Sequence, residues 1–164
     1  MCASTARSAW PRGEPLARPD PFRLNLPAYP HSATIQTRFQ DLDPLGHINN
    51  VAMAALFESG RVRFNQAIGL AGWKGHRWLV ARIEINYLAE GSFPADVEIA
   101  SGIGEIGTRS WEIQSAAFQD GFAIATCDAA IVLSGATGAS RLPDEFRAGL
   151  ERYRMKLSPP LPNL

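Results

Sequence analysis

Residues 50–68 constrain the fold more than any other part of the chain, because they are apolar at helical spacing and over most of the helix circumference. The i, i+3, i+4, i+7 pattern of one helix face is formed by Met53, Leu56, Phe57, Gly60, Phe64, Ala67 and Ile68. Such a helix is typical of a buried position. The pattern predicts one long internal helix, which begins at a cap on Asn49 or Asn50 and stops at Gly69.

Around this helix the sequence has the period of two that is typical of strands. One strand is expected at 32–39, before the helix, and four are expected after it, at 78–88, 95–103, 109–118 and 122–134. In the first of these four, one face is expected to carry Leu79, Ala81, Ile83, Ile85 and Tyr87. Short turns favour hairpins, and the apolar last segment favours a central strand.

A strand, a buried helix and then antiparallel strands predict an α+β fold with one curved sheet wrapped around the helix. We expect a single domain at 31–157, with a helix near its end at 143–156. Residues 1–30 are expected to form an irregular, Pro- and Arg-rich arm, and 158–164 an irregular tail. A single wrapped sheet leaves strand edges free, which favours pairing of two chains.

Composition narrows the possible partners. The 164 residues carry 16 basic and 16 acidic side chains, which argues against broad binding to nucleic acid or anionic membranes. No apolar run is long enough to cross a membrane or to form a secretory signal. Cys2 and Cys127 have no metal or disulfide spacing, so a reducing cytoplasm is the expected location.

The stretch FQDLDPLGHINN, residues 39–50, places polar and turn-forming groups directly before the helix. Pro44 and Gly46 favour a tight turn that brings Asp41 or Asp43 near the helix start. The first N–H groups of a helix lack internal partners and can bind a developing oxyanion. A carboxylate beside such donors suits acyl transfer, for example at a thioester. Ordinary helix capping explains the same residues and stays open as the alternative.

The segment RFQDLDPLGHINNVAMAALFESGR, residues 38–61, resembles the signature of hotdog-fold acyl-CoA thioesterases of the hydroxybenzoyl-CoA thioesterase-like family. The resemblance extends over about residues 33–150. It implies a hotdog fold and hydrolysis of an acyl-CoA to free acid and CoA. It also implies a homodimer or homotetramer, with no metal and no cofactor beyond the coenzyme A of the substrate.

By position in that signature, Asp43 resembles the catalytic carboxylate, as nucleophile or general base. The backbone N–H of Asn50 would polarise the thioester carbonyl, and Asp41 would orient the turn. The remaining residues that the resemblance places at the substrate pocket are Gly46, His47 and Asn49.

Further substrate contacts are expected on the helix and at a hairpin. Glu58 resembles a helix glutamate that some relatives use, although an i,i+3 pair with Arg61 also explains it. Arg109 and Ser110 are candidates for contacts with coenzyme A. Met53 stands where many relatives have tyrosine, which suggests a more apolar acyl pocket.

Two other functions remain open. An enoyl-CoA hydratase would use an aspartate and a histidine close together, and Asp43 and His47 are four residues apart. A binding domain that holds acyl-CoA without turnover would keep the same fold. Release of thiol distinguishes hydrolysis from both.

Overall fold

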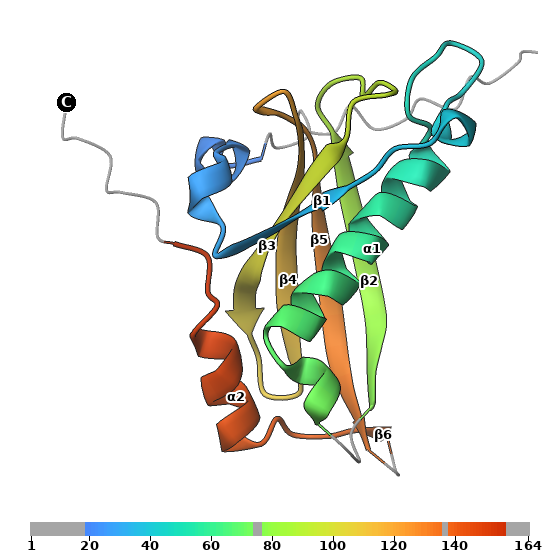
Figure 1. Ribbon diagram of the computed structural model, residues 1–164. Helices are drawn as coiled ribbons and strands as arrows, with labels where there is room; N and C mark the ends of the chain where they lie inside the picture. Colours follow the sequence, from blue (N-terminus) through green and yellow to red (C-terminus); the bar gives the residue numbers. More distant parts are fainter. Residues whose placement is uncertain (1–18, 74–76, 136–137, 157–164) are drawn as a thin grey trace, which may run out of the picture.

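The computed structural model describes residues 19–73, 77–135 and 138–156, and it contains one antiparallel sheet with strand order β1-β3-β4-β5-β2 (Figure 1). The elements are β1 (His31–Ile35), α1 (Asn50–Ala67), β2 (Arg77–Tyr87), β3 (Val97–Ile106), β4 (Ser110–Gln119), β5 (Phe122–Gly135), the short β6 (Gly138–Ala139) and α2 (Asp144–Glu151). The sheet curves around α1, so the predicted sheet-around-helix arrangement is confirmed. The expected central place of the last long strand is also confirmed, because β5 lies between β4 and β2.

The inner face of the sheet packs against α1. Val97, Ile99 and Ile103 of β3 point inward and are completely buried, whereas Glu98 between them is partly exposed. Gly60 belongs to the apolar stripe of α1 because the helix touches the sheet there. A Cβ on Gly60 would lie closer to the side chain of Ile99 than van der Waals contact permits.

The C-terminal helix closes the other end of the inner face. Phe146 and Leu150 of α2 are buried beside Phe64 of α1 and Trp111 of β4. The Phe146 ring meets that of Trp111 edge-on, with centroids 5.2 Å apart. The expected helix at 143–156 is therefore shorter than predicted, and it contributes to the core.

The alternation predicted for β2 is wrong at its start. A β-bulge between Val80 and Arg82 shifts the register against β5, so Val80 pairs with the inward-facing Ile131 and Leu79 pairs with Val132. Leu79 therefore lies on the outer face, although the period of two placed it with Ile83. Beyond the bulge, Ile83, Ile85 and Tyr87 follow the expected face.

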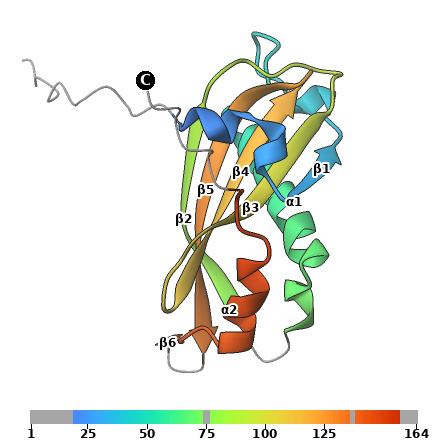
Figure 2. The same ribbon diagram turned by 90° about the vertical axis from the view of Figure 1, so that its left-hand side faces the viewer.

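Residues 19–30 form a strap over the outer face of the sheet (Figure 2). The strap contains two short 3₁₀ turns, η1 (Pro21–Leu24) and η2 (Leu26–Ala28). Its Ala28 and Tyr29 are buried against Ala100, Ala116 and Phe118 of the sheet. This part of the expected arm therefore wraps the surface, and residues 1–18 and 157–164 lie outside the described structure.

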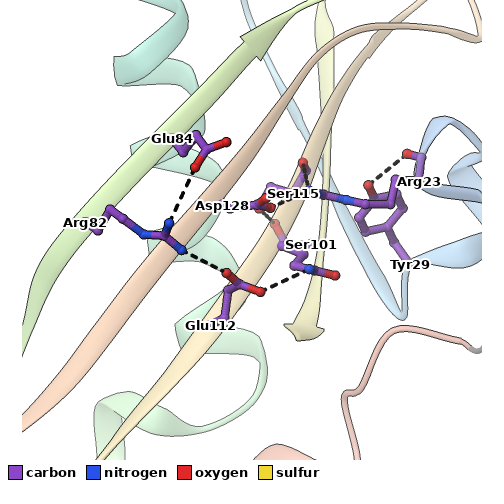
Figure 3. A network of polar contacts seen from close by, with 9 residues as sticks. Arg23, Tyr29, Arg82, Glu84, Ser101, Glu112, Ser115 and Asp128 are labelled. Carbon is purple, nitrogen blue, oxygen red and sulfur yellow. Dashed lines mark hydrogen bonds and ion pairs between the residues drawn. The ribbon is translucent and has the colours of Figure 1, made fainter. Parts of the chain in front are cut away.

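An ion pair fastens the strap to the sheet (Figure 3). Arg23 Nη1 donates to Asp128 Oδ2 on β5 at 2.9 Å, and Arg23 Nη2 donates to the carbonyl of Ser115 on β4. The hydroxyl of Tyr29 donates to the carbonyl of Arg23 at 2.8 Å. Arg23 and Asp128 are both largely buried, with side-chain exposures of 12% and 19%.

The two edges of the sheet differ. Beside β3, residues 153–156 continue the edge past β1, because Ile103 N–H donates to the Tyr153 carbonyl and Met155 N–H donates to the Ile103 carbonyl. The opposite edge is β2, which pairs only with β5. The described chain therefore leaves one long strand edge open.

The helix α1 is less enclosed than its composition predicts. It packs mainly against β1, β3 and β4, and Ile83 and Tyr87 on the inner face of β2 are 46% and 50% exposed. Val51 and Val62 are 80% and 48% exposed. None of the described helices is long and apolar enough to cross a membrane.

Candidate active site

The polar stretch before α1 folds into a closed turn. Leu42 and Ile48 form an antiparallel bridge, the Asp43 N–H donates to the His47 carbonyl at 2.8 Å, and the Gly46 N–H donates to the Asp43 carbonyl at 3.0 Å. Gly46 has φ of +85°, a conformation that glycine adopts without strain. The predicted turn is present, and its hydrogen bonds fix the backbone of Asp43.

The carboxylate of Asp43 is held by the backbone of its own turn. Its Oδ1 accepts hydrogen bonds from the N–H of Leu45 at 2.8 Å and of His47 at 3.1 Å. The His47 N–H is the main reason why the pKa of Asp43 lies below its ordinary value, and the Leu45 N–H adds to it. Asp43 is therefore ionised at neutral pH, and its Oδ2 has no hydrogen bond within the described chain.

The contacts of Asp41 indicate a structural role rather than a chemical one. It is 3% exposed, and its carboxylate accepts from the backbone N–H of Arg38 and from the guanidinium of Arg38, both at 2.8 Å. The side-chain hydrogen bond from Arg38 lowers the pKa of Asp41. Since both oxygens of this buried carboxylate are bound, Asp41 suits the predicted role of orienting the turn, although the Arg38 side chain itself is 62% exposed.

Asn49 joins this turn to the helix. Its Oδ1 accepts the N–H of Ala52 at 2.9 Å and so caps α1, while its Nδ2 and backbone N–H both donate to the Asp41 carbonyl. Asn49 is thus the N-cap of α1. The sequence had predicted a cap at either Asn49 or Asn50. In the described structure no acceptor binds the N–H of Asn50, at the positive end of an 18-residue helix.

Three residues outside the turn complete this end of the molecule. His47 Nε2 lies 3.1 Å from Glu90 Oε2, and the N–H of Ile48 donates to the carbonyl of Gly91 at 2.8 Å. The hydroxyl of Tyr87, at the end of β2, lies 3.5 Å from the Asn50 carbonyl. Sequence reasoning placed Tyr87 on a strand and did not connect it to the site, because only the sheet brings β2 to the helix start.

The other predicted substrate contacts lie farther away. Glu58 is two turns along α1 and 69% exposed. Arg109 and Ser110 are at the turn between β3 and β4, at the end of the sheet opposite to Asp43 and about 30 Å away along β3. Met53 is 2% exposed in the core between helix and sheet. Within one chain these residues do not meet Asp43, and their roles stay predictions.

The described residues contain no group of three or more His, Cys, Asp or Glu side chains that could hold a metal ion. The side chains that can react or bind at the turn are the carboxylates of Asp41, Asp43 and Glu90 and the imidazole of His47. The free N–H of Asn50 can stabilise negative charge on one atom of a ligand, and Asp43 can supply a carboxylate to another.

The comparison with known proteins identifies the family. Residues 37–150 match the thioesterase-like superfamily. The chain belongs to this superfamily. The matched region contains the turn, α1, the long strands and all of α2 but its last residue, and it does not contain the strap. No curated protein matches the sequence significantly.

Solved structures agree with this assignment. A predicted thioesterase from Bacillus stearothermophilus is 27% identical, with TM-score 0.70 over 77% of this chain and 98% of that one. A Thermus thermophilus thioesterase complexed with coenzyme A and Zn is 26% identical, with TM-score 0.68 over 76% and 95%. The PA5185 protein of Pseudomonas aeruginosa is 25% identical, with TM-score 0.73 over 83% and 99%.

These matches confirm the resemblance seen in the sequence, the hotdog fold and the expected class of enzyme, a thioester hydrolase. They leave the individual site residues and the substrate as predictions.

Proposed function

We propose that this superfamily member hydrolyses an acyl-CoA thioester to the free acid and CoA, with Asp43 as the reacting carboxylate. The observation that supports it is the arrangement of one turn. The Asp43 carboxylate is ionised and is fixed through its Oδ1. Hydrogen bonds between Asp41 and Asn49 connect its turn to the start of α1, where the N–H of Asn50 is free. The coenzyme A in the related Thermus structure supports a CoA thioester as the substrate.

The chemistry balances in either of two ways. As a nucleophile, Asp43 Oδ2 attacks the thioester carbon, the C–S bond breaks, the CoA thiolate takes a proton, and water cleaves the resulting anhydride. As a general base, Asp43 Oδ2 takes a proton from a water that attacks the same carbon, the C–S bond breaks, and the CoA thiolate takes up that proton. In both, the N–H of Asn50 stabilises the charge that develops on the carbonyl oxygen. The net reaction consumes one water and needs no cofactor.

We also propose that two chains pair through β2 to form a homodimer, the unit from which a tetramer could be built. The open edge of β2 offers unpaired backbone groups, and the side chains next to it are apolar and exposed. On this strand the side chains of Val80, Ile83 and Tyr87 are 45%, 46% and 50% exposed. Because Tyr87 is also near the start of α1, a partner seated there would border the site.

We also propose that the protein is located in a reducing cytoplasm, and the free, buried thiol of Cys127 supports this location. Burial raises the pKa of this thiol to about 11, so it is protonated at neutral pH. A catalytic cysteine needs the opposite shift. Cys127 is therefore a core residue here, and the proposed hydrolysis does not use it.

The test is the change Asp43→Asn, assayed by thiol release over a panel of acyl-CoA substrates from short aliphatic to aromatic. Loss of a charge at the reacting atom should lower kcat by at least about 100-fold. Asp120→Asn is the matched control, since Asp120 lies in the exposed turn between β4 and β5, where asparagine also tolerates the φ of 49°.

Wild-type rates in Asp43→Asn would refute the assignment of Asp43. Tight acyl-CoA binding without thiol release by the unaltered protein would instead identify a binding domain. Loss of enoyl absorbance on crotonyl-CoA, again without thiol release, would identify a hydratase.

A further inference from the structure

The loop between β2 and β3 is attached to the turn that holds Asp43 at two consecutive residues, at the same end of the molecule (Figure 1). Glu90 Oε2 lies 3.1 Å from His47 Nε2, and the carbonyl of Gly91 accepts the N–H of Ile48 at 2.8 Å. A Cβ on Gly91 would lie 2.8 Å from Cδ1 of Ile48, so the loop also packs directly against the turn. We call Glu90 and Gly91 the clamp.

The loop is itself held in place on both sides of the clamp. Before it, the backbone N–H groups of residues 88–89 donate to the carbonyl of Ile124 on β5, at 2.9 and 3.1 Å. After it, the buried side chain of Gln119 on β4 binds the backbone of Ser92 and Ala95 through hydrogen bonds of 2.8 and 2.9 Å. The clamp is therefore fixed to the end of the sheet, and it can hold the turn in one position.

His47 connects the clamp to the carboxylate of Asp43. The backbone N–H of His47 donates to Asp43 Oδ1 at 3.1 Å, and its carbonyl accepts the Asp43 N–H at 2.8 Å. A displacement of His47 therefore changes two of the contacts that fix Asp43 relative to the N–H of Asn50. Small displacements of a reacting group are enough to slow a reaction severalfold.

We propose that Glu90 is a positioning residue, which holds the imidazole of His47 and through it keeps Asp43 in place for hydrolysis. This inference rests on the proposed function of Asp43. Glu90 is 75% exposed and His47 is 35% exposed, and ion pairs at such exposed positions contribute little. We therefore expect the contact to change kcat by about two- to fivefold.

Few charged groups surround the imidazole of His47. The loop at residues 88–95 contributes Glu90 alone, and the first two turns of α1 carry no charged side chain. The turn itself contributes Asp43, whereas the carboxylate of Asp41 is already bound by a guanidinium. The charge of the imidazole therefore acts chiefly on Glu90 and Asp43.

The strength of the contact depends on the charge of His47. Histidine changes its charge between about pH 5 and 8. The protonated ring binds a carboxylate by a charge-assisted hydrogen bond, which is stronger than the neutral hydrogen bond that remains after the proton is lost. The contribution of Glu90 to kcat should therefore be present at acid pH and should decrease as the pH rises.

The test compares Glu90→Gln with the unaltered protein by thiol release between about pH 5.5 and 8. Glutamine keeps the shape and an oxygen that accepts from the ring, but it removes the charge. We expect kcat to fall about two- to fivefold at the acid end, with KM unchanged, and the difference to disappear toward the other end. Glu84→Gln is the matched control, because Glu84 is also exposed and pairs with Arg82 on the outer face. Its kcat should equal that of the unaltered protein throughout.

A second background removes the titration itself. His47→Gln replaces the ring by an amide that donates to Glu90 at every pH, so the further change Glu90→Gln should then have one constant effect on kcat. A pH-dependent effect that persists in this background would overturn the proposal. So would an unaltered kcat in Glu90→Gln at every pH.

Two other results would give Glu90 a different role and would also overturn the proposal. A loss of kcat of at least about 100-fold in Glu90→Gln at every pH would make Glu90 a catalytic carboxylate. A raised KM with unaltered kcat would make it a contact of the substrate.

Hydrogen exchange separates this inference from the proposed function. The backbone N–H groups of His47 and Ile48 are bound by the turn and by the clamp. Glu90→Gln should therefore speed their exchange about two- to fivefold at acid pH in NMR spectra, whether or not an acyl-CoA is hydrolysed. Unaltered exchange would overturn the clamp. An unaltered protein that releases no thiol, in which this exchange still depends on Glu90, would refute the proposed hydrolysis and support the clamp.

Discussion

Replacing Asn49 by alanine tests the link between the turn and the helix. The side chain of Asn49 makes two hydrogen bonds, one to the N–H of Ala52 and one to the carbonyl of Asp41. Removal of an asparagine cap costs about 1 kcal/mol of unfolding free energy. Loss of the second bond costs about 0.5–1 kcal/mol, because the Asp41 carbonyl keeps the backbone N–H of Asn49. We expect Asn49→Ala to lower the unfolding free energy by about 2 kcal/mol.

A second variant separates the two bonds. Asn49→Asp keeps an oxygen for the cap and places a negative charge at the positive end of α1, which is favourable. It cannot donate to the Asp41 carbonyl, and it brings a charge against that oxygen. We therefore expect Asn49→Asp to lose about half as much stability as Asn49→Ala. Its kcat should nevertheless fall, because the turn that holds Asp43 loses its side-chain link to the helix start and keeps only the backbone hydrogen bond.

Urea unfolding at neutral pH measures the first effect and thiol release the second. Asn25→Ala is the matched control. Asn25 precedes η2 but accepts no cap hydrogen bond, and its exposed Nδ2 only binds the Pro21 carbonyl. Its loss should change stability by less than about 0.5 kcal/mol. An Asn49→Ala protein as stable as the unaltered one, or an Asn49→Asp protein with unaltered kcat, would refute the reasoning.

Three further predictions follow from the contacts described. Arg23→Ala leaves Asp128 largely buried without its partner, and thermal unfolding should show a loss of about 2 kcal/mol. Gly60→Ala forces a methyl group against Ile99, so the variant should lose about 1–3 kcal/mol in urea unfolding despite the better helix propensity of alanine. Because Asp43 has a pKa lowered from 3.8, its ionised form persists as pH falls, and kcat/KM should show no acid limb from this group above about pH 4.

Each of these has a measurement that would contradict it. Arg82 is 59% exposed and pairs at 3.5 Å with both Glu84 and Glu112, so Arg82→Ala should cost less than about 1 kcal/mol. An equal loss in Arg82→Ala and Arg23→Ala would contradict the role of burial in the strap. A stabilised Gly60→Ala would show that α1 can move away from the sheet. An acid limb near pH 6 that disappears in Asp43→Asn would contradict the lowered pKa.

The sequence by itself determined the helix α1, the strand order along the chain and the turn that holds Asp43. These features depend on contacts between residues close in sequence. The spacing of apolar side chains sets the period, and Pro44 and Gly46 set the turn. The family signature lies in the same stretch, which is why the class of enzyme could also be predicted.

The tertiary structure decided what depends on distant partners. The bulge before Arg82 reverses the face of Leu79, a change that no local period records. The pairing of strands brings Tyr87 to the helix start and leaves Arg109 at the far end of the sheet. Burial separates the two aspartates, because the side chain of Asp41 is buried and that of Asp43 is partly exposed. These outcomes depend on which segments come into contact when the chain folds. Local sequence patterns indicate which faces of a helix or strand are apolar, but not which faces pack together.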